Sequence, residues 1–241
     1  MVDYRFVAKR FRRMAGRAKR ALVGAKPVAS PTEAISRLLD GKRATIVKIG
    51  SHDGVTDEPF RDLILSNPQW FVLFIEPVNS IFARLRRNYS DRRNCAFENV
   101  AIADEPSVRS FYYLSETIKR TNPDVVSWYD QLGSFDRNHI LKHDNSFEPF
   151  IVSDEVRCDT LSNVLAKYRL TGKPDFIHID AEGCDYEILK QIDLASKSLR
   201  AVLYEHVHLR ASDQAEAEHF LKASGFAVRQ LGFDTLAIKP R

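Results

Sequence analysis

Polar and charged residues follow several short apolar runs of this sequence, and these are the residues whose types could do chemistry. Each run is apolar and is stopped by a turn residue, which is typical of a buried strand in an α/β sheet. The strand-end residues are Gly50, His52 and Asp53; Glu76; Asn99; Asp180 and Glu182; and Glu205, His206 and His208. In an open α/β sheet, ligands bind beyond the carboxyl ends of the strands. So many polar residues at one edge indicate a catalytic site rather than a sheet built for packing alone.

The first of these turns follows the apolar run 46–49 and is bracketed by Gly50 and Gly54. A strand, a glycine turn and a helix, expected here over 58–65, bring backbone N–H groups close to a bound ligand. We expect a side chain at Gly50 to block that approach. The Gly-x-x-x-Gly spacing is neither a dinucleotide fingerprint nor a phosphate loop. Taken alone, the motif fits an ordinary strand-to-helix turn equally well.

A second apolar run, 70–75, ends in Glu76. A carboxylate at this point can accept hydrogen bonds from two ribose hydroxyls, and its charge disfavours a 2′-phosphate. The two strand ends together predict a nucleoside ligand without a pyrophosphate. S-adenosylmethionine (SAM) is the commonest cofactor of that kind.

Four segments, taken in order, resemble the FkbM family of SAM-dependent methyltransferases. They are residues 47–54, 74–77, 159–161 and 176–183, and the Ile-Asp-x-Glu-Gly sequence in the last is the most specific. The resemblance implies an α/β fold of the class I methyltransferase (Rossmann-like) type. That fold has a seven-stranded sheet, six strands parallel and one antiparallel, with helices on both faces. Lys48 departs from the pattern, because many class I methyltransferases carry an acidic residue there.

The resemblance also places adenine near Asn99, although a plain strand-end polar residue is the alternative. The expected cofactor-binding residues are therefore Gly50, Ser51, His52, Asp53, Gly54, Glu76 and Asn99.

Methyl transfer to a hydroxyl requires an aligned acceptor and a group that takes one proton. Asp180, His206 and His208 are the candidate catalytic residues. His206 and His208 are two apart, so they would share one face of a strand, and we expect His206 to meet Asp180 across adjacent strands. The alternative is a divalent metal such as magnesium held by Asp180, Glu205 and His206. That set matches no local ligand motif.

Two further residues near these strand ends have simpler explanations. His178 is expected to be a satisfied core histidine, and Cys184 a partly buried spectator thiol. With only three scattered cysteines in the chain, neither a disulfide framework nor a structural zinc site is expected.

Charge divides the chain of 241 residues into two parts: residues 1–26 carry nine Lys or Arg and one acid, whereas the whole chain is only +4. We expect a basic amphipathic arm over 1–30 and a methyltransferase domain over 31–241. The arm could be a solvated or partner-docking helix, contact an anionic membrane surface, or bind nucleic acid. Nucleic acid fits least, because the rest of the chain is acidic. Since no apolar run suits a membrane span or a signal peptide, the expected location is the cytoplasm, with peripheral membrane contact as an option.

Residues 116–150 interrupt the alternation of strands and helices, with a helix expected over 136–143. Polar sequence with interspersed aromatic residues in a long segment is typical of a lid or binding element. We interpret it as a cap that selects the substrate; a surface excursion is the alternative. The flanking strands are expected over 96–102, 108–114 and 152–158.

The sequence thus predicts an O-methyltransferase that acts on a hydroxyl of a small molecule, sugar or glycolipid. Members of the resembled family act on sugars, glycolipids and polyketide-type products. A non-catalytic protein on the same fold, binding nucleic acid or a membrane, is the alternative. The motifs of base N-methylation and cytosine C5 methylation are absent, and a dehydrogenase lacks its third glycine. A homo-oligomer is left open.

Overall fold

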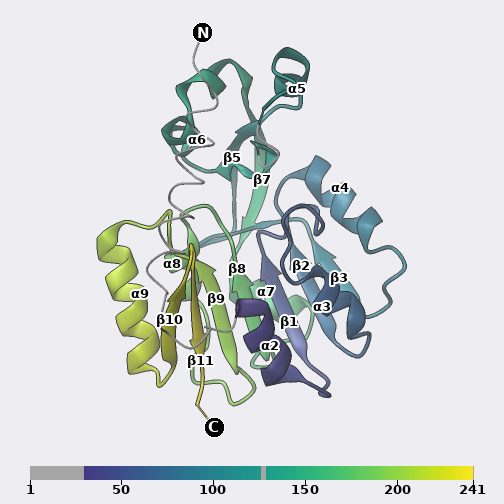
Figure 1. Ribbon diagram of the computed structural model, residues 1–241, viewed down its shortest axis with the longest axis vertical. Helices are drawn as coiled ribbons and strands as arrows, with labels where there is room; N and C mark the ends of the chain where they lie inside the picture. The colour runs from purple at the N-terminus through teal and green to yellow at the C-terminus, as the bar shows by residue number, and fades with distance from the viewer. Residues whose placement is uncertain (1–29, 126–128, 241) are drawn as a thin grey trace, which may run out of the picture.

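The computed structural model describes residues 30–125 and 129–240 (Figure 1). The predicted basic arm therefore lies outside the described residues, apart from Ser30. Within the described part of the chain, no helix combines the length and the apolar character that crossing a membrane requires.

Seven strands form the main sheet. They are β1 (Thr45–Ile49), β2 (Phe71–Ile75), β3 (Cys95–Glu98), β8 (Phe176–Ile179), β9 (Ala201–Glu205), β10 (Ala227–Leu231) and β11 (Asp234–Ile238). Their order is β10-β11-β9-β8-β1-β2-β3. Strand β11 runs antiparallel to both of its neighbours, and every other pairing is parallel. This confirms the predicted class I methyltransferase sheet, which has one reversed strand near its edge.

Helices cover both faces of this sheet (Figure 1). On one face are α2 (Pro31–Leu39), α3 (Arg61–Ser66) and α4 (Asn79–Asn88); on the other are α7 (Leu161–Lys167), α8 (Asp185–Leu189) and α9 (Ala211–Ala223). Alternate strand residues point to opposite faces, so Ile46 packs with the first set of helices and Val47 with the second. Burial on both faces explains why the strands are almost continuously apolar.

A second, smaller sheet rises from the main one. It contains β4 (Ala101–Ile102), β5 (Ser107–Leu114), β6 (Gly133–Ser134) and β7 (Ile151–Asp159), in the order β4-β7-β5-β6. The prediction of one strand over 96–102 was wrong, because the chain changes sheets between β3 and β4. Asn99 lies at the change, and its side-chain amide donates to the carbonyls of Glu76 and Pro77.

The segment predicted as a cap (116–150) lies at one end of the molecule, beyond the main sheet (Figure 1). It contains α5 (Thr117–Thr121), η1 (Tyr129–Gln131), β6, α6 (Arg137–His143) and η2 (Asn145–Phe150). Its apolar residues form a small core of their own, which includes Ile118, Tyr129 and Ile140. Asp136 caps α6 by accepting from the backbone N–H of Asn138, so the predicted helix over 136–143 forms. The paired strands β5 and β7 connect this segment to the sheet.

Candidate active site

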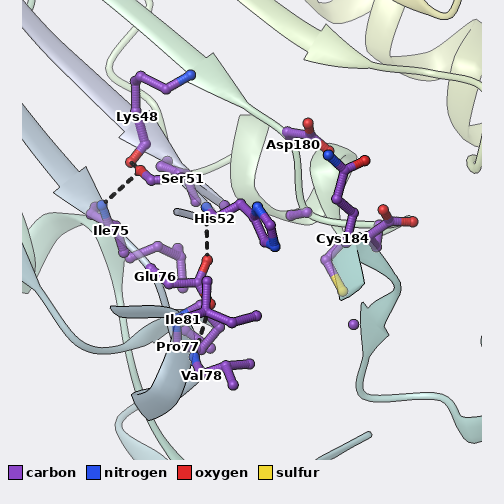
Figure 2. Close-up of a pocket in the computed structure, with 18 of the residues that line it drawn as sticks. Lys48, Ser51, His52, Ile75, Glu76, Pro77, Val78, Ile81, Asp180 and Cys184 are labelled. Carbon is purple, nitrogen blue, oxygen red and sulfur yellow. Dashed lines mark hydrogen bonds between the residues drawn. The ribbon is translucent and has the colours of Figure 1, made fainter. Parts of the chain in front are cut away.

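A cavity lies between the carboxyl ends of the main-sheet strands and the cap. The sheet contributes Gly50, Ser51, His52, Glu76, Asp180, Glu182 and Glu205, and the cap contributes Asp130, Gln131, Gly133 and Ser134. Figure 2 shows His52 and Glu76 on one side of this cavity, and Asp180 and Cys184 on the opposite side. The ends of β1, β2, β8 and β9 therefore converge as predicted.

Gly50 packs tightly against the neighbouring strand. Its φ is +71°, and an added Cβ would lie 1.7 Å from the carbonyl oxygen of Asp180. The predicted reason for this glycine therefore needs correction, because a side chain would first strike the protein backbone and not a bound ligand. Gly54 is similarly confined, since its added Cβ would lie 2.4 Å from the ring of Tyr89.

Two polar residues of the turn mainly hold its shape. The buried Ser51 hydroxyl donates to the carbonyl of Lys48 and accepts from the backbone N–H of Ile75. The Asp53 carboxylate accepts from the backbone N–H groups of Val55 and Thr56. Burial opposes ionisation of Asp53, but the nearby His52 ring and the hydrogen bonds from these N–H groups hold its pKa well below the usual range. Asp53, Gly54 and Asn99 are not among the residues that line the cavity.

The Glu76 carboxyl is buried at the end of β2, 5% exposed. It accepts hydrogen bonds from the backbone N–H groups of His52 at 3.0 Å and Val78 at 2.9 Å. Burial outweighs these bonds and raises the pKa of Glu76 to about 7. Apolar residues line the cavity beside it, among them Ile81 and Ile102. A carboxylate next to an apolar slot suits a nucleoside.

His52 adopts a left-handed backbone conformation with φ of +47°. Its ring nitrogens lie 3.4 Å from the Asp53 carboxylate and 3.8 Å from that of Asp130, and neither nitrogen makes a hydrogen bond. Burial lowers the pKa of His52, but the nearby carboxylates outweigh that effect and raise it above the ordinary value. Asp130 also accepts from Arg84 at 2.9 Å, which ties the cap to α4.

Lys48 is buried and paired. Its ammonium donates to Nδ1 of His178 at 2.7 Å and lies 2.5 Å from the carboxylate of Glu58. Burial and the lysine charge hold the pKa of His178 well below its ordinary value, so this ring accepts the hydrogen bond as a neutral group. The structure thus agrees with a satisfied core histidine.

Three carboxyl groups crowd the far side of the cavity. Asp180, Glu182 and Glu205 each offer an oxygen within 4.8 Å of the other two. Burial and, second, the Glu182 charge raise the pKa of Asp180 to about 7. Burial raises the pKa of Glu182 and Glu205 as well. Asp180 can therefore exchange a proton near neutral pH. The thiol of Cys184 is a poor nucleophile, because burial raises its pKa to about 11.

The structure does not bring His206 to Asp180. Strand β9 ends at Glu205, after which the backbone N–H of His206 donates to Phe233 and its Nδ1 pairs with the Thr235 hydroxyl at 3.0 Å. His206 lines no part of the cavity. The predicted metal set therefore does not assemble, since Asp180 and Glu205 gather with Glu182 in place of His206.

His208 also lies outside the cavity lining, but it lies close to two carboxyl groups. Its Nε2 lies 3.5 Å from the carboxylates of both Glu182 and Glu205. Two histidines of α6 in the cap, His139 and His143, complete this group. Neither histidine was predicted as a site residue, although a His-x-x-x-His spacing inside a predicted helix puts both rings on one face.

Residues 48–234 match the model of the methyltransferase FkbM domain family. The chain belongs to this family. The matched region begins at Lys48 and ends at Asp234, so it includes every strand end that lines the cavity of this FkbM-domain methyltransferase. No curated protein matches the sequence.

Solved structures similar to this FkbM-domain chain are distant in sequence. A precorrin-6y C5,15-methyltransferase from Geobacter metallireducens GS-15 shares 12% identity with a TM-score of 0.40, over 90% of this chain and 94% of that one. A SAM-dependent methyltransferase from Aquifex aeolicus shares 10% identity with a TM-score of 0.39, and the match covers 87% of this chain and 88% of that one. The fibrillarin of Aeropyrum pernix, solved with natively bound SAM, shares 10% identity with a TM-score of 0.39. That match covers 80% of this chain and 65% of the fibrillarin chain. The family assignment rests on the family model and not on these likenesses.

Proposed function

We propose that this chain is a SAM-dependent O-methyltransferase that acts on a hydroxyl of a small molecule, sugar or glycolipid. Its membership of a methyltransferase family supports the reaction class. One observation supports oxygen as the atom that accepts the methyl group: the Asp180 carboxyl lines the cavity, and its pKa is raised to about 7. A base with a pKa near the working pH is suited to remove a hydroxyl proton.

The residues at the β1 and β2 ends fit SAM. The Glu76 carboxylate would bind the ribose hydroxyls, and the apolar residues beside it would contact adenine. The ring nitrogens of His52, buried at the cavity without hydrogen bonds, offer polar partners to a ligand. When bound, SAM supplies a methyl group on a sulfonium that is already activated for transfer.

The residues of this chain would then perform three tasks. Glu76 and the glycine turn hold the cofactor, and the cap encloses the acceptor on the opposite side. Asp180 accepts the hydroxyl proton on its carboxylate as the oxygen becomes nucleophilic. Repulsion between the Asp180 and Glu182 carboxylates, which lie close together, helps to raise the pKa of Asp180 toward the working pH.

The cap provides side chains that could recognise the acceptor through hydrogen bonds and aromatic contacts. The carboxylate of Asp130, the amide of Gln131 and the hydroxyl of Ser134 line the cavity beside the rings of Tyr113 and Phe135. Hydroxyl-rich acceptors such as sugars suit this mixture of hydrogen-bonding and aromatic groups. A glycolipid acceptor would also agree with membrane contact by the basic arm, which lies outside the described residues.

The test combines binding with transfer. Calorimetric titration of SAM should show binding to the wild type, to Asp180→Asn and to the control Asp62→Asn, whose side chain is 99% exposed. Transfer of labelled methyl from SAM to a panel of sugars and glycolipids should be lost only in Asp180→Asn, by about 10²–10⁴-fold. Folded wild type that binds no SAM would refute the methyltransferase assignment. A methyl group found on nitrogen or carbon would refute O-methylation alone.

A further inference from the structure

Four potential metal ligands converge where the cap meets the sheet. His139 and His143 come from α6 of the cap, Glu182 follows β8, and His208 follows β9. Each residue offers one ligand atom, and the four atoms all lie within 4.8 Å of one another. The group shares no residue with the metal set predicted from the sequence, which was Asp180, Glu205 and His206.

Two distances within this group are close to those between the ligand atoms of a bound zinc ion. Nε2 of His139 lies 2.9 Å from Oε2 of Glu182, and Nε2 of His208 lies 3.5 Å from the same oxygen. A tetrahedral zinc ion with ligands at about 2.1 Å holds its ligand atoms about 3.4 Å apart. Since all four ligand atoms already lie within 4.8 Å of one another, side-chain adjustments alone could bring them around an ion.

The three imidazole rings surround a common point. Their centroids lie 4.9–5.3 Å apart, and each pair meets edge to face with interplanar angles of 63–79°. Rings that pack only against one another would not be expected to place two nitrogens beside one carboxylate oxygen, as those of His139 and His208 are placed beside Oε2 of Glu182. Burial also keeps the rings in the neutral form that binds metals, since it lowers the pKa of His143 and His208 to about 4.

The sequence of α6 supports this arrangement. His139 and His143 are four apart on a helix, so they lie on one face and can bind the same ion. The strands β8 and β9 are parallel neighbours, so the residues after them lie close together. Glu182 and His208 are 15% and 21% exposed in their side chains, which leaves an ion a route from solvent.

We propose that His139, His143, Glu182 and His208 bind one divalent transition-metal ion of the zinc type, which fastens the cap to the catalytic edge of the sheet. Three imidazoles and one carboxylate favour zinc, iron or nickel over magnesium and calcium, which prefer ligand sets made entirely of oxygen. Because Glu182 also lines the cavity, the ion would lie beside the substrate site and would position the carboxyl next to Asp180.

The experiment measures metal on the full-length chain, first as purified and then after removal with a chelator. Elemental analysis should find about one transition-metal ion per chain. Titration of the stripped protein with Co²⁺ should produce the intense visible absorption of a four-coordinate ion with nitrogen ligands, and Zn²⁺ should displace it. Zn²⁺ should also slow proteolysis within the cap. These readouts require neither SAM nor an acceptor, so they test the metal site independently of the proposed function.

Variants locate the site. His143→Ala and His208→Gln should each weaken Zn²⁺ binding by at least about 100-fold, more than the usual loss from removing an outer-shell partner. His219→Ala is the matched control, because this histidine is exposed on α9 and belongs to neither group of potential ligands. Circular dichroism should show each variant folded. Wild type that binds no transition metal, or cluster variants that bind as tightly as the control, would overturn the proposal. If a variant does not fold, the Co²⁺ spectrum of the wild type still decides.

Discussion

The Glu76 carboxylate accepts a hydrogen bond from the backbone N–H of His52 at 3.0 Å. This single contact joins the end of β2 to the turn after β1, which are the two strand ends that the sequence assigns to cofactor binding. The residue proposed to hold the ribose therefore also holds the turn that is proposed to surround the cofactor.

Replacing Glu76 with Gln should weaken SAM binding by about 10–100-fold, because a hydrogen bond to a charged group contributes about 1.5–3 kcal/mol. The amide can still accept from one backbone N–H, so the fold should survive. Calorimetry measures the affinity, and Glu105→Gln, at an exposed glutamate, is the control. Equal affinities in the two variants would remove Glu76 from the cofactor site.

The free energy of unfolding should fall as pH rises. Burial raises the pKa of Glu76 and of Asp180 to about 7 in the folded chain. The folded state thus binds these protons more tightly than the unfolded state does. The resulting stabilisation is complete below the unfolded pKa values and is lost as pH rises through about 7.

Urea unfolding of ligand-free, metal-stripped protein at about pH 5 and about pH 8 checks this. The protein should be more stable at the lower pH, and Asp180→Asn should show a smaller difference. A wild type that gains stability toward pH 8 would contradict the expectation.

Gly50→Ala should destabilise the protein by about 2–4 kcal/mol, combining the strain of a left-handed residue with overpacking. The overpacking arises because the new Cβ would lie 1.7 Å from the carbonyl oxygen of Asp180. Gly172→Ala separates the two effects, since Gly172 has φ of +66° but nothing within 4 Å of an added Cβ. Denaturant titration should show a clearly smaller loss for that control. Equal losses would mean that the turn can move away from β8.

The ion pair between Arg84 and Asp130 should stabilise the cap. The pair is 2.9 Å long, with side chains 28% and 13% exposed. Arg84→Met leaves a half-buried carboxylate beside His52, so proteolysis within 116–150 should accelerate. A double-mutant cycle with Asp130→Asn should give a coupling energy of about 0.5–3 kcal/mol. The same change at Arg86, which is exposed on the same helix, should have little effect. A coupling near zero would show that the cap does not depend on this pair.

Much of the cavity was predictable from the sequence, because strand ends in a parallel sheet must meet at one edge. Glycine after β1, an acid after β2 and acids after β8 are all readable along the chain. The structure places Gly50, Glu76, Asp180 and Glu182 accordingly.

Side-chain directions after the strand ends were not predictable. The pairing of His206 with Asp180 assumed that the strand alternation continued past Glu205. The chain instead turns there, with the N–H of Leu209 donating to the carbonyl of His206, so period two no longer applies. The change of sheets at Asn99 is equally hidden, because the flanking residues remain apolar and β-prone.

The group of four potential metal ligands shows a different limit of prediction from sequence. His139 and His143 lie in a segment with no strand–helix rhythm, and only the fold brings them to Glu182 and His208, residues 39 or more positions further along the chain. A local spacing can mark two of the four ligands but not their partners.

Both ends of the cap leave from one adjacent pair of residues, because Leu114 of β5 is the register partner of Ile151 of β7. In the topology of the fold, the whole intervening segment is therefore a single hairpin connection between β5 and β7. Segments of other lengths could be exchanged at this junction without changing the path of the chain through the core. If the cap selects the acceptor as proposed, such an exchange would change acceptor preference and leave the strand ends proposed to bind the cofactor unchanged.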